Sequence, residues 1–306
     1  MDKLLSLCIP TYGVVEWVIP VIDSIYAQNV SEDLYEVVVT DNGNNKEFEQ
    51  IMTTYIEKHK NFVYKKTNSH SFLNEIDAYK TATGVFIKFI NHRTILKEGG
   101  VKKYLNFIEE NIDYKPCVYF SNGKLKLKDK LTLSSFDEYV KTLSYWSSWS
   151  TGMGFWKEDF EKIDPDQKFN ELFPHTNILF SERKKNKYII IDDYMLEELP
   201  QNNKPKGNYD LYYAFGIEYV GILLDLLRDK SISVGTFNHV KEMNSYFIAS
   251  LYYEYNIRKH YSSYDISSFE SSISVNYNIK DIKKKSNKIL RRKILKKLFC
   301  NFNRSR

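Results

Sequence analysis

The chain has 306 residues, enough to bury a full core in one large domain or in one domain with an added part. Apolar residues make up 42% and charged residues 27%, and Gly (12) and Pro (7) are scarce, which excludes a mainly disordered protein. Cys8, Cys117 and Cys300 are far apart and odd in number, which argues against a disulfide framework or a cysteine zinc site. We therefore expect a reducing, cytoplasmic compartment.

Positive charge is concentrated at the C-terminus. Residues 280–306 hold 12 Lys or Arg and the single acid Asp281, a net charge of +11, whereas the whole chain carries only +5. Residues 1–279 therefore carry a net charge of −6.

Within this basic tail, apolar residues recur at helical spacing, which predicts a cationic amphipathic helix lying on anionic lipid. Nucleic acid is the rival partner, but the acidic body favours a membrane; a solvated tail or a helix docked on the core is the structural alternative. No window approaches the roughly 20 apolar residues of a membrane span, so we expect peripheral attachment to the inner face of the plasma membrane. The apolar residues are Ile282, Ile289, Leu290, Ile294, Leu295, Leu298, Phe299 and Phe302.

The first part of the chain alternates short apolar runs with longer amphipathic stretches. The runs at 4–9, 36–40, 62–65 and 85–90 predict strands, and the stretches at 16–28, 46–59 and 72–83 predict helices. This order predicts an α/β fold with a mostly parallel sheet and helices on both faces. In such sheets ligands bind at the carboxyl ends of the strands. The turns at 10–13, 41–45 and 91–93 are therefore the first candidate site.

The second part is less regular. Residues 118–121 and 124–128 predict a hairpin around Asn122-Gly123, residues 188–191 a strand, and residues 211–227 and 240–255 long helices. A polar, Gly- and Pro-containing cluster at 201–208 is the best boundary. The expected organisation is a catalytic domain at 1–200, a helical region at 209–279 and the basic tail at 280–306.

Three stretches together resemble the inverting family 2 glycosyltransferases of the GT-A fold. Residues 5–13 read Leu-Ser-Leu-Cys-Ile-Pro-Thr-Tyr-Gly, and residues 37–44 read Val-Val-Val-Thr-Asp-Asn-Gly-Asn. An Asn-bearing segment then leads to Ala82-Thr83-Gly84 and a further strand. The resemblance covers residues 4–180 and depends on the order and spacing of these pieces. A more specific resemblance is to bacterial capsule and O-antigen transferases, which add a sugar to a lipid-linked saccharide acceptor.

The resemblance implies a nucleotide-sugar donor, with a UDP-sugar favoured, held at the strand ends. Asp41 could equally start an Asx turn, Thr11 and Tyr12 could cap and pack the next helix, and Glu16 also complements a helix dipole. The implied donor-binding residues are Pro10, Thr11, Tyr12, Glu16, Asp41, Asn42, Asn68, Asn74, Asn91, His92 and Arg93.

The chain departs from the family where the metal-binding DxD motif is expected, because it has His92-Arg93-Thr94 there. Two carboxylates at this point normally hold Mg²⁺ or Mn²⁺ against the donor diphosphate. We hypothesise metal-independent transfer, in which Arg93, aided by His92, stabilises the departing nucleoside diphosphate. Asp192-Asp193 is an alternative metal pair or a solvated turn. The alternative function is an inactive relative that binds nucleotide-sugar or serves as a scaffold subunit.

Inverting transfer also needs a general base for the acceptor hydroxyl. Residues 151–156 and a helix at 157–163 match the family stretch that precedes this base, and His175 stands where the usual acidic pair is missing. We predict His175 as the base, although a His there could also bind phosphate or pack. Glu171, Asp164 and Asp166 are its rivals. Nearby aromatic residues either stack on the acceptor sugar or line the core: Trp146, Trp149 and Trp156.

Overall fold

The computed structural model describes residues 3–200 and 207–304, with side chains described up to residue 293. It divides into two compact units. The first comprises residues 1–139 and 146–200, and the second comprises residues 140–145 and 201–306.

The first unit is built on an eight-stranded sheet with the order β3-β2-β1-β4-β8-β6-β9-β7. β1 is parallel to β2 and β4, β2 to β3, and β6 to β9, whereas β8 runs antiparallel to both of its neighbours and β7 to β9. The predicted α/β class with a mostly parallel sheet is confirmed. The strands are β1 Leu5–Thr11, β2 Tyr35–Asp41, β3 Phe62–Lys66, β4 Phe86–Phe89, β6 Cys117–Phe120, β7 Leu131–Leu133, β8 Met153–Trp156 and β9 Tyr188–Ile191.

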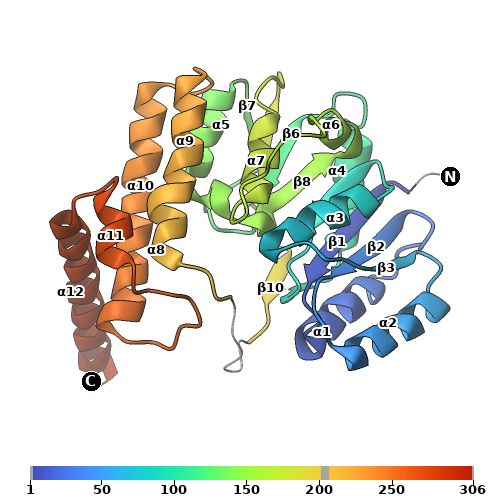
Figure 1. Cartoon of the computed structure of the whole chain (residues 1–306), viewed down its shortest axis with the longest axis horizontal. Helices are drawn as coiled ribbons and strands as arrows, with labels where there is room; N and C mark the ends of the chain where they lie inside the picture. Colours follow the sequence, from blue (N-terminus) through green and yellow to red (C-terminus); the bar gives the residue numbers. More distant parts are fainter. Residues whose placement is uncertain (1–2, 201–206, 305–306) are drawn as a thin grey trace. The chain divides into compact units, whose positions relative to one another are not determined.

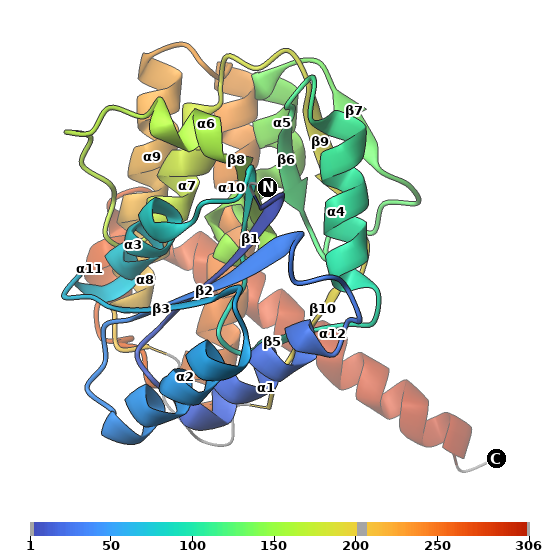
Figure 2. The same cartoon turned by 90° about the vertical axis from the view of Figure 1, so that its right-hand side faces the viewer.

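Helices cover both faces of this sheet, because its central strands are apolar on both sides and cannot face water. α1 (Val15–Tyr26), α2 (Lys46–Lys58) and α4 (Gly100–Asn111) contribute to one core. Figure 2 shows α4 on one side of β1 and α3, α6 and α7 on the other. The helices of the second face are α3 Asn74–Thr81, α6 Lys157–Glu161 and α7 Pro174–Ser181; α5 spans Phe136–Leu143.

A second, two-stranded sheet pairs β5 (Thr94–Leu96) with β10 (Leu196–Glu198) in antiparallel register, with Glu198 opposite Thr94. The sequence analysis did not predict it, because three-residue strands are too short to show a period. The pair matters for function because β5 begins directly after Arg93 and β10 brings a distant acid to the same place.

The predicted hairpin around Asn122-Gly123 is wrong. Its first half is β6, but residues 124–128 form no strand. Instead, the Asp192 carboxylate accepts hydrogen bonds from Ser121 Oγ and from the backbone amides of Leu125 and Leu127 at 2.5, 3.2 and 2.8 Å. One half-buried carboxylate therefore replaces the cross-strand ladder of a hairpin.

The second unit is helical (Figure 1), and the long helices predicted at 211–227 and 240–255 are confirmed. Both contain a short π-helical stretch, at Ala214–Glu218 and at Tyr253–Ile257. The helices are α8 Leu211–Tyr213, α9 Tyr219–Arg228, α10 Val234–Tyr252, α11 Phe269–Ser274 and α12 Ile279–Arg304.

The basic tail forms α12, and its first half docks on the second unit. Ile282 is buried, and Lys285 and Lys293 form ion pairs of 2.8 and 2.7 Å with Glu242 and Glu254. The docked helix named as an alternative is therefore the arrangement of the described part. The predicted apolar residues from 294 onward lie outside the described side chains.

No helix in the described ranges is both long enough and apolar enough to cross a membrane.

Candidate active site

The first two predicted turns lie side by side at the carboxyl ends of β1 and β2. Thr11 is in register with Asp41, and the Asn42 amide donates to the Thr11 carbonyl at 3.1 Å. Gly43 packs so tightly here that a Cβ atom would lie 2.0 Å from the Tyr12 carbonyl oxygen. Glycine is required at this position by close approach of the backbone.

Asn74, at the start of α3, holds these two strand ends together. Its side-chain amide donates to the carbonyls of Thr11 and Thr40, each at 3.0 Å, and its oxygen accepts from the Thr67 hydroxyl at 2.8 Å. The side chain is buried. Its polar atoms are therefore used within the protein, and we assign it a positioning role rather than the predicted contact with the donor.

Asp41 is also buried, and its carboxylate has several partners. Oδ1 accepts from the Gly43 amide at 2.7 Å, which is an Asx turn, and Oδ2 accepts from the Tyr64 hydroxyl at 2.9 Å and from Lys66 Nζ at 3.0 Å. The Asx turn named as the alternative role is therefore present. Recognition of a base by Asp41 stays a prediction, and it would require Lys66 or Tyr64 to yield its place.

Three predicted residues, Tyr12, His92 and Arg93, lie around one buried aromatic ring, Trp17 on the first turn of α1. The Tyr12 and His92 rings lie 6.5 and 5.5 Å from it, and the Arg93 guanidinium lies 5.2 Å from the ring centre. His92 Nδ1 is 3.1 Å from the Thr11 hydroxyl. The turns after β1 and β4 thus form one surface, as predicted for Thr11, Tyr12, His92 and Arg93.

His92 does not add positive charge to this surface. Burial, and secondarily the neighbouring Arg93 cation, lower the pKa of His92 to about 3. The imidazole is therefore neutral near pH 7, and any help it gives to a diphosphate is limited to a hydrogen bond.

Arg93 is different, because its guanidinium pairs with no carboxylate among the described residues. The turn that carries it is shaped by Asn91, whose side-chain oxygen accepts from the Arg93 amide at 3.0 Å and whose carbonyl accepts from the Thr94 amide at 2.9 Å. Asn91 is thus a turn residue. The Arg93 guanidinium lies over the Trp17 ring, and a guanidinium can make a planar, two-oxygen contact with phosphate.

The residues at the end of β4 do not fit a divalent metal ion. Within the described ranges, no three His, Cys, Asp or Glu side chains are placed to hold an ion. The alternative pair is also unsuitable: the Asp192 carboxylate is used in the loop described above, and Asp193 forms an ion pair with Lys103. The metal pair at 192–193 is therefore wrong, and no step of transfer is assigned to a metal.

The other predicted donor-binding residues lie at the edge of this surface. Pro10 is the one partly exposed residue of β1, Glu16 is exposed in the first turn of α1, and Asn68 is exposed in the loop after β3. The side-chain amide of Asn42 donates to the carbonyls of Ser69 and Ser71, at 2.9 and 3.2 Å. It fastens that loop to the end of β2.

His175 is not presented as a base. It begins α7 as a buried side chain, with Nε2 2.9 Å from the Ser148 carbonyl and Nδ1 3.3 Å from the Glu75 carboxylate, itself buried. A ring nitrogen beside a carbonyl acts as a hydrogen-bond donor, so Nε2 cannot also take a proton from the hydroxyl of an acceptor sugar. We therefore assign His175 to positioning the loop that contains Ser148.

The rival acids Glu171, Asp164 and Asp166 are exposed. Glu171 is 65% exposed and pairs with His70 at 3.7 Å. Asp164 accepts from the Asp166 amide at 2.9 Å, which is an Asx turn.

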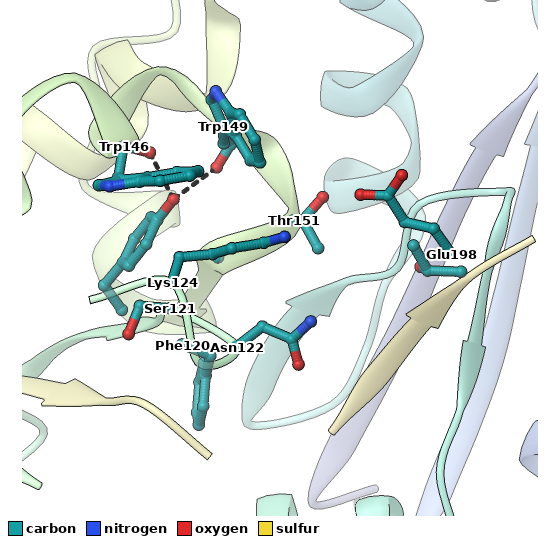
Figure 3. Close-up of a pocket in the computed structure, with 11 residues that line it drawn as sticks. Phe120, Ser121, Asn122, Lys124, Trp146, Trp149, Thr151 and Glu198 are labelled. Carbon is teal, nitrogen blue, oxygen red and sulfur yellow. Dashed lines mark hydrogen bonds between the residues drawn. The ribbon is translucent and has the colours of Figure 1, made fainter. Parts of the chain in front are cut away.

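A pocket that is partly open to solvent lies further along the same rim (Figure 3). It lies beside the carboxyl ends of β4 and β6 and the start of β8. Because β8 is antiparallel to both strands, its first residues lie at their carboxyl ends. We call it the rim pocket. Its lining residues are Thr94, Tyr119, Phe120, Ser121, Asn122, Lys124, Trp146, Trp149, Thr151, Gly152 and Glu198.

Of the three Trp residues predicted to stack on a sugar or to line the core, one lies in the core and two line the rim pocket. Trp156 is fully buried and its indole donates to the Pro116 carbonyl at 2.9 Å. Trp146 and Trp149 are half-buried in the rim pocket, with ring centres 4.3 Å apart and nearly perpendicular.

The segment that follows these two Trp residues is fixed by hydrogen bonds from Lys88. Lys88 on β4 is buried and donates to the carbonyls of Thr151, Met153 and Phe89 at 2.8, 2.9 and 2.8 Å. Burial lowers the pKa of Lys88 to about 7.

Tyr119 supports the same loop from beneath. Its hydroxyl donates to the Trp146 and Trp149 carbonyls, at 2.5 and 3.0 Å. A Cβ atom on Gly152 would lie 2.0 Å from the Tyr119 ring. Only glycine fits over this ring.

Sequence reasoning missed Trp17, Lys88 and Glu198. A Lys inside an apolar strand and a Trp directly after a strand-end turn are signals that could have been followed. Glu198 gives no such signal, because its place depends on the unpredicted pairing of β10 with β5.

This geometry defines a GT-A-type α/β fold with a candidate site along one rim of the sheet. The sequence profile described as "Glycosyl transferase family 2" matches residues 6–172. The match covers more than half of the chain, so the protein belongs to glycosyl transferase family 2 and is a glycosyltransferase. No curated protein matches the sequence.

Solved structures of similar fold have low sequence identity. Staphylococcus aureus TarS 1-349 in complex with UDP-GlcNAc is 16% identical with a TM-score of 0.60, over 82% of this chain and 73% of that one. The same fragment in complex with UDP has a TM-score of 0.57 at 16% identity, over 82% and 72% of the two chains. The mannosyltransferase PcManGT of Pyrobaculum calidifontis, in complex with GDP-Man and Mn²⁺, is 14% identical with a TM-score of 0.50, over 80% and 71%. At these identities the likeness supports the fold alone.

Proposed function

We propose that this glycosyltransferase moves a sugar from a nucleoside diphosphate, with UDP favoured, to a lipid-linked saccharide acceptor in capsule or O-antigen synthesis, with inversion and without a divalent metal. The observation that carries the proposal is Arg93, a guanidinium that pairs with no carboxylate in the described part of the chain and stands where the family places metal-binding carboxylates. TarS, in complex with UDP-GlcNAc, shares the fold.

In the proposed reaction the nucleotide lies over the ends of β1 and β2, against Tyr12 and the Thr11–Asp41 edge. The diphosphate lies at Arg93, and the sugar extends toward the rim pocket. As the bond between the anomeric carbon and the diphosphate oxygen breaks, negative charge grows on the leaving group. A fixed guanidinium stabilises that charge more than it stabilises the ground state.

A second candidate is a protein that binds nucleotide-sugar without turning it over, as a scaffold subunit. The missing carboxylates and the internally paired Asp41 favour it. Titration calorimetry with UDP-N-acetylglucosamine, UDP-glucose, UDP-galactose and GDP-mannose, followed by measurement of diphosphate release, separates the two. The transferase predicts binding with release, and the scaffold predicts binding alone.

We also propose that α12 holds the enzyme at an anionic membrane. Lys280, Lys284, Lys288 and Arg291 recur every three or four residues, so they share one face of the helix. All four are exposed and none has an ion-pair partner among the described residues. Each cation near an anionic surface contributes about 1 kcal/mol.

Co-sedimentation with phosphatidylserine vesicles tests this membrane proposal. Replacing Lys284, Lys288 and Arg291 together by Glu should abolish binding, whereas Lys102→Glu on α4 should not. Equal binding of both variants would contradict it.

A further inference from the structure

The structure leaves the acceptor hydroxyl without the expected base, because His175 is buried and turned inward. A carboxylate does face the rim pocket. Of the eleven residues that line it, Glu198 is the one acid. Figure 3 shows its carboxylate on the side of Thr151, across from Trp146 and Trp149.

Glu198 is placed there by strand pairing rather than by a mobile side chain. It lies opposite Thr94 in the β5–β10 ladder, and residues directly opposite share one face of a sheet. Both residues line the pocket. The next backbone bond of this ladder runs from the Leu199 amide to the Arg93 carbonyl, at 2.8 Å. The acid therefore sits one strand away from the proposed diphosphate site.

The carboxylate is also unused. Glu198 is exposed and forms no hydrogen bond or ion pair with any residue that the structure describes. By contrast, the acids at 192 and 193 are engaged as described above. Within the pocket, Glu198 is thus the group that is both able to accept a proton and free to do so.

We propose that Glu198 is the catalytic carboxylate that takes the proton from the attacking acceptor hydroxyl, and that the rim pocket holds the sugar being transferred between Trp146 and Trp149 and this acid. The inference rests on the proposed function. The acceptor oxygen forms a bond to the anomeric carbon as its proton passes to Glu198. The bond from that carbon to the diphosphate oxygen breaks, and its electron pair leaves with the nucleoside diphosphate beside Arg93.

Glu197 supplies a matched control. It precedes Glu198 on the same short strand, is equally exposed and, because successive side chains alternate, lies on the opposite face. Glu198→Gln and Glu197→Gln therefore remove the same charge from adjacent positions, and each keeps a side chain of the same shape.

The assay measures release of the nucleoside diphosphate by the full chain, with water as the acceptor. The donor is UDP-N-acetylglucosamine, or another donor of the panel if calorimetry selects it. Glu198→Gln should lower kcat by about 10²–10⁴-fold, the usual contribution of a general base. Its donor Kd and melting temperature should match the wild type, and Glu197→Gln should keep wild-type kcat. Glu198→Asp should retain part of the activity.

Wild-type kcat in Glu198→Gln, with donor binding intact, would overturn this inference and leave the proposed function standing. Equal losses in both Gln variants would also overturn it, because they would reflect charge near the rim rather than a specific base. Absence of donor binding and release in the wild type would overturn the proposed function and this inference together.

Discussion

The two ends of the rim use their polar groups in opposite ways. At the β1–β2 end, Asn74 and Asp41 are buried and bonded to backbone and side-chain partners. At the β4–β6 end, Arg93 and Glu198 pair with no oppositely charged residue that the structure describes. The polar groups of the first end stabilise the local fold, whereas those of the second end can interact with the charges that develop during the reaction. Substitutions should therefore affect stability at one end and turnover at the other.

Outside Glu198, the largest effect is expected at Arg93. Arg93→Ala should lower kcat by about 10²–10³-fold, since it removes the one fixed cation beside the leaving group. The kcat of Arg93→Lys should lie between those of the wild type and Arg93→Ala, because an ammonium cannot make the two-oxygen contact. Nucleoside diphosphate release at saturating donor measures both, and Arg228→Ala, at an exposed position on α9 of the second unit, is the control. Full activity of Arg93→Ala would remove the cation from the mechanism.

At the other end, Asn74→Ala should mainly change stability. Two buried carbonyls and one hydroxyl lose their partner, which should lower the free energy of unfolding by about 2–3 kcal/mol. Asn68→Ala, a nearby exposed position, should change it by less than about 0.5 kcal/mol. Urea unfolding measures the difference. Equal stabilities of the two variants would mean that the Asn74 side chain is not needed to hold the ends of β1 and β2 together.

Lys88 supports the pocket and should make stability depend on pH. Its pKa of about 7 in the folded protein lies well below the ordinary value near 10.4 of the unfolded chain. Between these values the unfolded state binds more protons, so stability rises with pH. Wild type should gain about 2 kcal/mol from pH 7 to pH 9 relative to Lys88→Met. Parallel stability curves for the two proteins would contradict this.

The smallest effect is expected from the pocket wall. Trp149→Ala should raise KM by about fivefold, which corresponds to about 1 kcal/mol for one stacking contact, with kcat little changed. Trp149→Phe should recover most of the loss. Steady-state kinetics with the donor selected by calorimetry separates the two constants, and a fall in kcat alone would contradict a stacking role.

Residues whose roles depend on local pattern were predictable from the sequence. The alternation of apolar runs and helices placed β1 to β4 and the strand-end turns, and the Thr11–Tyr12 turn does meet His92 and Arg93. The roles of Asn74 and His175 were not predictable, because they depend on which distant carbonyl each side chain reaches. The β5–β10 pair was missed for the same reason, and the acid at 198 with it.

The most direct test of the account is the rate of nucleoside diphosphate release from a nucleotide-sugar donor in excess EDTA, compared with the rate in Mn²⁺. With Arg93 in place of the metal-binding carboxylates, the two rates should be equal. A rate lost in EDTA and restored by Mn²⁺ would contradict the central claim.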